Sequence, residues 1–504
     1  MTMAPERPAA LFDRVTEWDD LVRFATEPTA SFRIGVVSGR RRQGKSFILD
    51  EVARAVGGLY HQALEEERAP ALERLGAAMA ADRGLSGGSL SFPDWSALLR
   101  TLADPTTATP RTAATATPRL VVIDEYPYLL AKSPDIASAI QLAYDASRLG
   151  GQPPLRLILC GSAMSVMAGL LSGQRALRGR AVLDLVIDPF DYREAAAFWG
   201  VQGDPRLAFL LFCVVGGTPG YRDLLEMGPP TAVGDFGAWL ARGVLNPSHA
   251  MFREADYLLA EEPSLPDRAI YQSALAAIAA GRTTSGAVAG ALGRPETSIT
   301  HVIDGLERAR FIERADDVLR SRRPALRITD AMLRFQHAVI RPDLHRFESR
   351  QTLAAWTDAQ ARFESGVAGP AFEAIARAWT ERYASMETLG GTAVRVGSTV
   401  VNDRAGRSRV EIDVVAVEGR SGDDDGANPA LLLIGEAKSG PDPRGMADLR
   451  RLERARELLA GRARVERTRL AIFAAGGFNE DLKAEATRRS DVVLVDLKRL
   501  YAGD

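Results

Sequence analysis

Three observations in the sequence predict a multidomain α/β protein. The chain has 504 residues, which at about 100 to 200 residues per domain corresponds to about three domains. Apolar residues make up 46% and charged residues 25%, and this balance excludes disordered, collagen-like and coiled-coil chains. Short apolar runs alternate with helix-like stretches in two separate parts of the chain, a pattern typical of sheets whose strands are joined by helices.

The first α/β domain is predicted over residues 1–190. Its strands are three short apolar runs, each followed by a stretch with apolar residues at helical spacing: FRIGVV at 32–37, RLVVIDE at 119–125 and LRLILCGS at 155–162. This alternation favours a parallel sheet. Residues 83–93 and 104–118 lack a hydrophobic pattern, so we expect two loops there, the longer one a disordered surface insertion.

Three further domains are predicted after this core. The pattern becomes helical over residues 191–266, which indicates a small helical lid. Residues 267–330 contain three helix-like stretches followed by two strand-like segments, the order of a winged helix-turn-helix. A helical stretch and then alternating strands over residues 331–504 predict a second α/β domain, with a hairpin-type loop at 420–429.

The composition limits which binding partners and which cellular compartment are expected. With 63 basic and 65 acidic side chains the net charge is -2, so any surface for nucleic acid must be local. Cys160 and Cys213 both lie in apolar runs, which favours buried free thiols in a reducing compartment over a disulfide. The five His residues lie far apart, so zinc sites and a Ser/His/Asp triad have no support. We find no signal peptide or membrane helix and expect a cytoplasmic protein without a membrane partner.

The first chemical motif is a phosphate-binding loop. Gly39, Gly44, Lys45 and Ser46 fit the spacing G-x-x-x-x-G-K-[ST], between a predicted strand and a predicted helix. Lys is rare, with five among the 63 basic residues, so a Lys at this position is informative. Such a loop turns backbone N–H groups toward a β-phosphate, Lys45 neutralises the β and γ oxygens, and the Ser46 hydroxyl ligates Mg²⁺. The motif therefore predicts ATP and Mg²⁺ as cofactors.

Polar residues at the ends of the next two predicted strands complete this ATP site. Asp124 and Glu125 end the second apolar run, at the edge of a parallel sheet where ligands bind. We expect Asp124 to hold Mg²⁺ and Glu125 to orient or deprotonate the attacking water. Ser162 ends the third run and is either a sensor of the γ-phosphate or a helix N-cap. Arg178 and Arg180 are candidates for an arginine finger, with ordinary surface salt bridges as the alternative.

A second group of charged residues lies near the C-terminus. Asp413 is in the strand-like segment RVEIDVVAVEG; Glu436 and Lys438 are in LLLIGEAKS, where a spacing of two puts both on one face of a strand. Asp413 and Glu436, on adjacent strands, are candidate Mg²⁺ ligands, and Lys438 can activate a water for metal-assisted hydrolysis. Glu373, on a predicted helix, is a candidate to complete the metal site. The alternatives are a buried structural ion pair for the trio and a solvated helical side chain for Glu373.

The N-terminal motifs together resemble a known family. They are similar to those of the archaeal-type AAA+ ATPases of prokaryotes, a group related to the signal-transducing STAND ATPases, over about residues 10–330. The resemblance implies ATP hydrolysis by a P-loop AAA+ core followed by a helical lid and a winged-helix domain. The segments that carry it are GRRRQGKS (39–46), LVVIDE (120–125), GSAMSVMAGLLSG (161–173), LRGR (177–180), DPFDYREA (188–195) and GGTPGY (216–221).

The C-terminal array resembles a second family. Glu373, Asp413 and the EAK segment at 436–438 are similar to the PD-(D/E)XK nuclease superfamily, whose domains end many proteins of that ATPase group. The resemblance implies a restriction-endonuclease-like α/β domain with Mg²⁺-dependent DNA cleavage. Two features depart from the pattern: no Pro precedes Asp413, and Glu411 supplies a second acid on the same strand face.

These observations lead to two hypotheses of different classes. The leading one is an ATP-hydrolysing protein, able to form a homo-oligomer, that binds and cleaves DNA. The alternative is a STAND-like nucleotide-dependent switch whose C-terminal domains mediate interactions and do not cut DNA. The complete acid, acid and Lys array favours the first.

Residues 296–311 are the predicted recognition helix, with an inward apolar stripe and these outward polar residues: Thr297, Ser298, Thr300, His301, Arg308 and Arg310.

Overall fold

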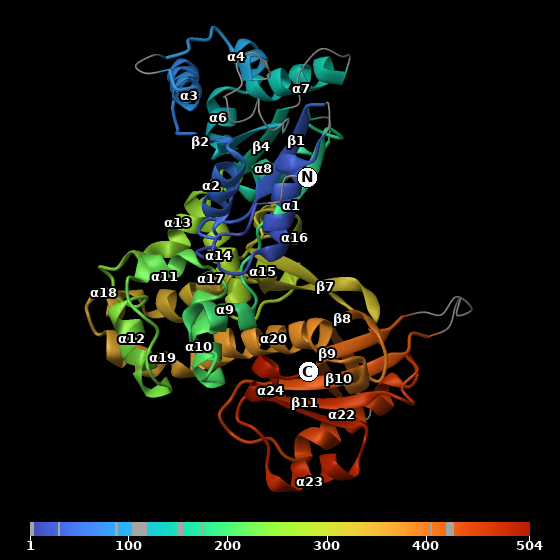
Figure 1. Cartoon of the computed structure of the whole chain (residues 1–504). Coiled ribbons are helices and arrows are strands. Elements are labelled where there is room, and N and C mark those ends of the chain that lie inside the picture. Colours follow the sequence, from blue (N-terminus) through green and yellow to red (C-terminus); the bar gives the residue numbers. More distant parts are fainter. Residues whose placement is uncertain are drawn as a thin grey trace. The chain divides into compact units, whose positions relative to one another are not determined.

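The computed structural model divides the chain into two compact units (Figure 1). Unit 1 is Met1–Pro189 with Leu258–Pro266, and unit 2 is Phe190–Tyr257 with Asp267–Asp504. The described residues are 5–28, 31–85, 89–102, 118–148, 155–173, 175–403, 406–419 and 428–504. The predicted loops at 104–118 and 420–429 lie almost entirely outside them. Within the described ranges, no helix combines the length and the apolar character needed to cross a membrane.

Unit 1 contains a five-stranded sheet of order β2-β3-β4-β1-β5, in which every pairing is parallel. The three predicted apolar runs form β1, β3 and β4, and their residues are almost all buried because helices cover both faces of the sheet. The end of β4 therefore lies between the ends of β1 and β3. The strands are β1 (Arg33–Ser38), β2 (Leu59–Gln62), β3 (Arg119–Asp124), β4 (Leu155–Gly161) and β5 (Ala181–Val186).

Two apolar cores hold the helices of unit 1 against this sheet. Alternate residues of β3 face opposite sides, so Leu120 and Val122 join the core of α1 and α2, whereas Val121 and Ile123 join the core of α3, α4 and α7. The predicted α/β class with a parallel sheet is confirmed. The helices are α1 (Val15–Thr26), α2 (Lys45–Val56), α3 (Arg68–Asp82), α4 (Trp95–Leu102), α6 (Tyr126–Lys132), α7 (Asp135–Arg148) and α8 (Met164–Leu170).

Unit 2 begins with helices and continues with a β-hairpin. The boundary between the units at Tyr257–Leu258 falls inside α13, so this helix begins in unit 2 and ends in unit 1. On α16 the predicted apolar stripe is fully buried, which leaves the polar residues of the other face outside. The elements are α9 (Tyr192–Trp199), α10 (Pro205–Val215), α11 (Gly220–Leu225), η2 (Val233–Asp235), α12 (Phe236–Arg242), η3 (Ala250–Arg253), α13 (Glu254–Ala260), α14 (Arg268–Ala279), α15 (Ser285–Ala291), α16 (Glu296–Arg308), β6 (Ile312–Asp317) and β7 (Arg320–Ile328).

A seven-stranded mixed sheet of order β12-β11-β10-β9-β8-β6-β7 forms the centre of unit 2. β8, β9 and β10 are an antiparallel meander, and β10, β11 and β12 are parallel because helices connect them. The hairpin β6–β7 joins the sheet through a single pairing of Asp317 with Ser398. The remaining strands are β8 (Ala393–Asp403), β9 (Ser408–Glu418), β10 (Leu431–Lys438), β11 (Arg469–Ala474) and β12 (Val492–Asp496).

Helices α20 and α22 pack on this sheet through neighbouring residues of β11, and therefore on opposite faces. Leu449 and Leu452 of α22 share a core with Ile472, whereas Trp379 of α20 packs edge-on against Phe473 with ring centroids 5.8 Å apart. The other helical segments are α17 (Ala331–Phe335), η4 (Gln336–Ile340), η5 (Arg341–Asp343), α18 (Leu344–Glu348), α19 (Thr352–Phe363), η6 (Glu364–Ala368), α20 (Gly369–Arg382), α21 (Met386–Leu389), α22 (Met446–Leu459), α23 (Glu480–Arg488) and α24 (Leu497–Ala502).

A substitution at Gly39, the first glycine of the phosphate loop, tests the packing of unit 1. A Cβ added at Gly39 lies 2.5 Å from the carbonyl oxygen of Ile187, so Gly39→Ala must displace backbone. We expect it to lower the free energy of unfolding by about 1 to 3 kcal/mol in urea denaturation. Gly169→Ala is the control, because a Cβ there meets nothing within 4 Å and the position is helical. Equal stability of Gly39→Ala and wild type would contradict the close approach.

Candidate functional site

The phosphate loop connects β1 to α2 with the motif lysine buried at the start of the helix. Gly44 precedes α2 with φ 88°, a backbone conformation that favours glycine. Lys45 is 5% exposed, and its Nζ donates a hydrogen bond to the carbonyl oxygen of Arg40 at 2.8 Å. Burial lowers the pKa of Lys45, and the nearby charges of Asp124 and Glu125 oppose that effect. The lysine is therefore held close to both predicted acids.

Asp124 ends β3 as a fully buried carboxylate that is well supplied with hydrogen bonds. The hydroxyl of Tyr60 donates to Asp124 Oδ2 at 2.6 Å, and the backbone N–H of Glu125 donates to Oδ1 at 2.9 Å. Burial raises the pKa of Asp124, but hydrogen bonds from Ser46, Tyr60 and Cys160 outweigh it, so the net pKa is lowered. Asp124 is thus kept ionised, and Ser46, the other predicted Mg²⁺ ligand, lies beside it.

Glu125 has the opposite electrostatic environment. Its backbone is left-handed with φ 51°, which directs the residue out of the strand at the N-terminus of α6. Burial and the neighbouring charge of Asp124 raise the pKa of Glu125. Ser162 donates from Oγ to Glu125 Oε2 at 3.3 Å. The N-cap position of α8 is Ala163, so Ser162 is not the N-cap of this helix, and its role as a sensor of the γ-phosphate stays a prediction.

The two candidate arginine fingers differ in their contacts. Arg180 forms a two-pronged ion pair with Asp145, at 3.0 and 2.9 Å, which is the surface salt bridge named as the alternative. Arg178 donates from Nη1 to the carbonyl oxygen of Gly173 at 2.9 Å and is exposed. Both predicted thiols, Cys160 and Cys213, are buried and free.

Two contacts around this site had no signal in the sequence. Tyr60 lies in the short strand β2 and meets Asp124 across 64 positions of the chain. Arg41 of the phosphate loop forms an ion pair with Glu261, in the segment that returns to unit 1. Residues so distant in sequence become neighbours only through the strand order. Neither a motif nor a periodicity could have revealed them.

The C-terminal group of predicted residues meets on one face of the mixed sheet. Gly435 of β10 pairs with Val414 of β9 in antiparallel register, so Glu436 and Asp413 lie opposite each other. Lys438 Nζ is 2.5 Å from Glu436 Oε1 and 4.0 Å from Asp413 Oδ2. The structure therefore brings the two acids and the lysine together from adjacent strands.

Both acids of this group are buried, but only Glu436 lies close to two cationic groups, those of Lys438 and Arg451. Asp413 is 6% exposed and accepts a hydrogen bond from the backbone N–H of Ala437 at 2.8 Å. Burial, followed by the charges of Glu373 and Glu436, raises the pKa of Asp413 to about 7. Glu436 is 2% exposed and also lies 3.4 Å from Arg451 Nη1.

Helix α20 brings Glu373 toward the same group. Glu373 Oε2 lies 3.6 Å from Arg377 Nη1, and Arg377 donates to the backbone carbonyl of Asp413 at 3.0 Å. The charge of Glu373 also contributes to the raised pKa of Asp413. Glu411, a second acid of β9, is exposed, so Asp413 is the acid of this strand that lies beside Glu436.

The donor set fits a hydrated divalent cation better than a closed protein cage. Over the described ranges, no three or more His, Cys, Asp or Glu side chains are arranged to hold a metal ion. Asp413 and Glu436 supply two carboxylates, and Mg²⁺ commonly keeps several water ligands beside one or two carboxylates. At the phosphate loop, Ser46 and Asp124 likewise supply two oxygen donors. Both pairs therefore fit Mg²⁺ as an expected ion.

Comparisons with known proteins show distant similarity. No protein-family model matches the chain. "Uncharacterized protein MJECL04" of Methanocaldococcus jannaschii is 24% identical over 322 residues, which cover 63% of this chain and 66% of that protein, just under two thirds of its length.

Two solved structures are also similar. The Walker-type ATPase PABY2304 of Pyrococcus abyssi has a TM-score of 0.49 and 18% identity, with 66% of this chain and 97% of that chain covered. The ORC2 protein of Aeropyrum pernix, in ADPNP-ADP complexes, has a TM-score of 0.41 and 13% identity, with 72% and 97% covered. The P-loop fold of unit 1 is defined by its own strand order and motif.

The raised pKa of Asp413 predicts an unusual dependence of stability on pH. Its value of about 7 in the folded chain lies above the ordinary 3.8, so folding takes up a proton between these values and ionisation at higher pH costs stability. Asp413→Asn cannot ionise. We therefore expect the variant to gain about 1 to 3 kcal/mol over wild type in free energy of unfolding as pH rises from 5 to 8, measured by urea denaturation in EDTA.

The control for this measurement is Glu418→Gln, which removes an exposed acid at the end of the same strand. Its difference from wild type should not depend on pH. A difference between Asp413→Asn and wild type that stays constant over the same range would contradict the buried, uncompensated carboxyl.

Proposed function

We propose that this protein is an AAA+ ATPase whose ATP hydrolysis is coupled to DNA binding and to Mg²⁺-dependent cleavage of DNA by its C-terminal domain. The observation that carries the proposal is the convergence of Asp413, Glu436 and Lys438 on one sheet face, on the same chain as a phosphate loop. The roles of these residues follow from their environments.

In the ATP site, Asp124 and Glu125 have different proposed roles. Mg²⁺, when bound, supplies positive charge to the β and γ phosphate oxygens. Asp124, kept ionised by its donors, and Ser46 would hold the ion, while Lys45 contacts the phosphates. Glu125 has a raised pKa, which makes it a better proton acceptor for the attacking water. Ser162, bonded to Glu125, is placed to respond to the γ-phosphate.

A segment after α13 offers a route by which nucleotide could influence the rest of the chain. Glu261 pairs with Arg41 of the phosphate loop, and Glu262 accepts a hydrogen bond from Ser165 at the start of α8. Both acids follow α13, the helix that begins in unit 2. A change in the phosphate loop on nucleotide binding would therefore act on Glu261, next to the end of α13. These contacts support a coupling of the nucleotide state to the part of the chain that α13 joins to unit 1.

In the C-terminal site, the lysine and the acids have separate roles. Asp413 and Glu436 would hold Mg²⁺, which polarises a phosphodiester and its attacking water. Lys438 contacts both acids and is placed to orient or deprotonate that water. Glu373, from α20, is an accessory acid at the edge of the site.

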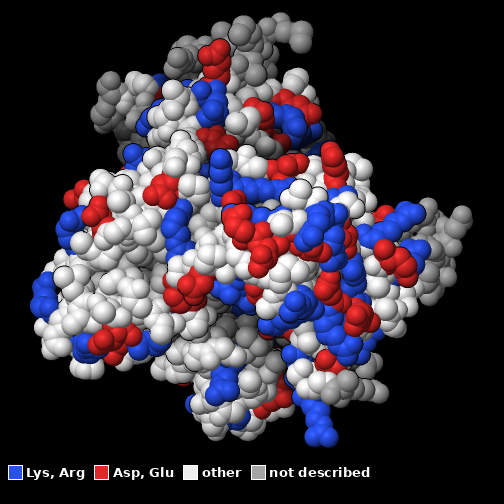
Figure 2. Space-filling model, turned by 90° about the horizontal axis from the view of Figure 1, so that it is seen from below, with Lys and Arg blue, Asp and Glu red and all other residues white. Residues whose placement is uncertain are grey.

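DNA binding is proposed for the exposed face of α16. The apolar stripe of this helix is buried, while Thr297, Thr300, His301 and Arg308 are exposed. On the face drawn in Figure 2, basic and acidic side chains are interspersed, as expected for a net charge of -2. DNA binding therefore depends on local groups such as Arg308 rather than on the overall charge. A homo-oligomer, with Arg178 reaching a neighbouring ATP site, is part of the same proposal.

The alternative function is a nucleotide-dependent switch without DNA cleavage. The observation in its favour is the tight contact of Lys438 with Glu436, which a purely structural ion pair would also make. In that case the C-terminal domain would serve as an interaction module. The two functions differ in what removal of Lys438 does.

The ATP site predicts a separation between binding and turnover. Lys45→Ala should lower ATP affinity at least about 100-fold in calorimetry, because Lys45 contacts ground-state phosphate. Glu125→Gln should bind ATP like wild type but lose hydrolysis, because Glu125 acts on the attacking water. Lys132→Ala, which removes an exposed Lys of unit 1, is the control and should change neither property. Wild-type ATP affinity in Lys45→Ala would contradict the site.

The C-terminal site predicts a different separation. Glu436→Gln should lose Mn²⁺ binding in calorimetry, because one carboxylate does not hold the ion against its hydration shell. Lys438→Ala should still bind Mn²⁺ but lose cleavage of plasmid, branched or single-stranded DNA tested with Mg²⁺ and ATP. Glu418→Gln should match wild type in both assays. If Lys438→Ala instead lowers stability by about 3 to 5 kcal/mol and leaves DNA cleavage unchanged, the group is a structural ion pair.

A further inference from the structure

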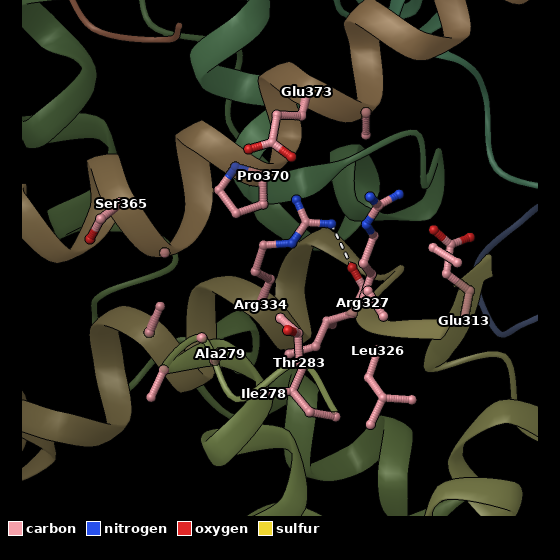
Figure 3. Close-up of a pocket in the computed structure, with 18 of the residues that line it drawn as sticks. Ile278, Ala279, Thr283, Glu313, Leu326, Arg327, Arg334, Ser365, Pro370 and Glu373 are labelled. Carbon is pink, nitrogen blue, oxygen red and sulfur yellow. Dashed lines mark hydrogen bonds between the residues drawn. The ribbon is translucent and has the colours of Figure 1, made fainter. Parts of the chain in front are cut away.

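A large cavity lies beside the proposed hydrolytic site, within unit 2. Its volume is about 1050 Å³, and its walls come from the end of α14, the hairpin β6–β7, α17, α20 and β8 (Figure 3). Pockets for small ligands commonly measure about 300 to 1000 Å³, so this cavity leaves room for more than one nucleotide unit. Among the residues given a role in the proposed function, Glu373 alone lines it.

Three arginines, Arg327, Arg334 and Arg377, place positively charged hydrogen-bond donors in the cavity wall. Arg327 donates to Ser398 Oγ at 2.7 Å, and Arg334 donates to the carbonyl oxygen of Ile328 at 2.6 Å. Both partners are neutral, and among the described side chains no carboxylate lies within ion-pair distance of either guanidinium. Each guanidinium has several N–H donors, so most of them are left for another partner. Figure 3 shows both groups pointing toward the side of the cavity where Glu373 lies.

The third arginine, Arg377, strengthens the positive character of that side. Burial and the like charge of Arg327 lower the pKa of Arg377 to about 10. Two guanidinium groups that repel each other in a half-buried space favour anionic groups around them, and the charges of Glu373, Glu313 and Asp413 already act on Arg377 in this sense. Arg341 and Arg362, also in the cavity wall, are engaged with Gln272 and Asp343.

The acids of the cavity wall are partly neutralised. Asp317 accepts hydrogen bonds from Thr399 Oγ1 at 2.6 Å and from the N–H of Leu319 at 2.9 Å. Glu373 is 3.6 Å from Arg377. Glu313 lies opposite Arg327 in the hairpin, and Glu411 is exposed. The charges of Asp330, Glu313 and Glu373 act on Arg334 from a distance, but none of these acids forms an ion pair with Arg327 or Arg334 among the described side chains.

A buried histidine in the same wall independently indicates a ligand. His337 is 5% exposed, and its Nδ1 has no hydrogen-bond partner in the part of the chain that the structure describes. Burial and the charge of Arg341 lower the pKa of His337 to about 3, so the ring is neutral. Buried polar nitrogens are rarely left without a partner. A polar ligand in the cavity would supply one.

Residues of α20 join the cavity wall to the hydrolytic residues, because Arg377 of the wall donates to the backbone carbonyl of Asp413 at 3.0 Å. Glu373 also lines the cavity, and its charge acts on Arg334 as well as on Asp413. A chain molecule with one phosphate at Asp413 and Glu436 would thus have its neighbouring phosphates near the three arginines. A free phosphate could bind at the arginines without reaching Asp413 and Glu436.

We propose that the cavity binds the backbone phosphates of the DNA strand that enters the Asp413–Glu436–Lys438 site, with Arg327 and Arg334 as the phosphate-binding residues. The proposal rests on the proposed function of that site and adds the path of its substrate. Arg–phosphate contacts are directional and salt-dependent, so the path can be measured without cleavage.

The test measures binding of a fluorescent single-stranded oligonucleotide to the full chain by anisotropy, in EDTA so that no cleavage occurs, over a range of salt. Arg327→Gln with Arg334→Gln should weaken binding at least about tenfold and lower the salt slope by about 1.4, because each lost phosphate contact contributes about 0.7. Arg488→Gln, at an exposed arginine of α23, is the matched control and should bind like wild type. Arg308→Ala with Arg310→Ala measures the share due to α16.

Thermal melting shows whether the double variant is folded, and Arg327→Gln alone, which removes one neutral contact, is used if it is not. Wild-type affinity and salt slope in a folded variant would overturn the proposal, as would an oligonucleotide that does not bind wild type. Arginine-dependent binding of dAMP or inorganic phosphate without oligonucleotide binding would also overturn it and assign the cavity to a small phosphate compound. Arginine-dependent strand binding in a protein that cuts no DNA would support this proposal and count against the proposed cleavage alone.

Discussion

The organisation of both sites depends on the cost of burying a carboxylate. A buried charge is tolerated only where hydrogen bonds or opposite charges replace water. Asp124 meets this requirement with donors from Tyr60, Ser46 and its own neighbour, so its pKa is lowered. Burial, together with the charges of Glu373 and Glu436, raises the pKa of Asp413 to about 7, and the backbone donor of Ala437 and the charge of Lys438 offset this only in part. Asp124 is therefore ionised before a cation binds, whereas a bound cation would favour the ionised form of Asp413.

The same constraint accounts for the positions of the cations around each acid. Lys45 and Lys438 are two of the few lysines in an arginine-rich chain, and each lies against a buried acid at a strand end or in a strand. The ammonium group of Lys438 lies 2.5 Å from Glu436 and 4.0 Å from Asp413, whereas the planar guanidinium of Arg377 contacts Glu373 and a backbone carbonyl at the edge of the site. Residue choice therefore follows the space that each cation must fill.

Much of unit 1 was predictable because its central strands are buried on both faces and read as continuous apolar runs, as in RLVVIDE. Asp413, Glu436 and Lys438 were found because a charge inside an apolar strand is conspicuous. Tyr60 was missed because β2 is short and its contact with Asp124 depends on strand order. The cavity could not be predicted, since its wall is assembled from residues between positions 276 and 411 that share no pattern.

The central claim is that one chain carries two separate divalent-cation sites, one with nucleotide and one without. Anomalous diffraction at the manganese edge, from crystals grown with Mn²⁺ and a non-hydrolysable ATP analogue, tests it most directly. One peak should lie beside Ser46 and Asp124 and require the nucleotide, and a second should lie between Asp413 and Glu436 without it. Manganese at the phosphate loop alone, with Asp413 and Glu436 still bridged by Lys438, would contradict it.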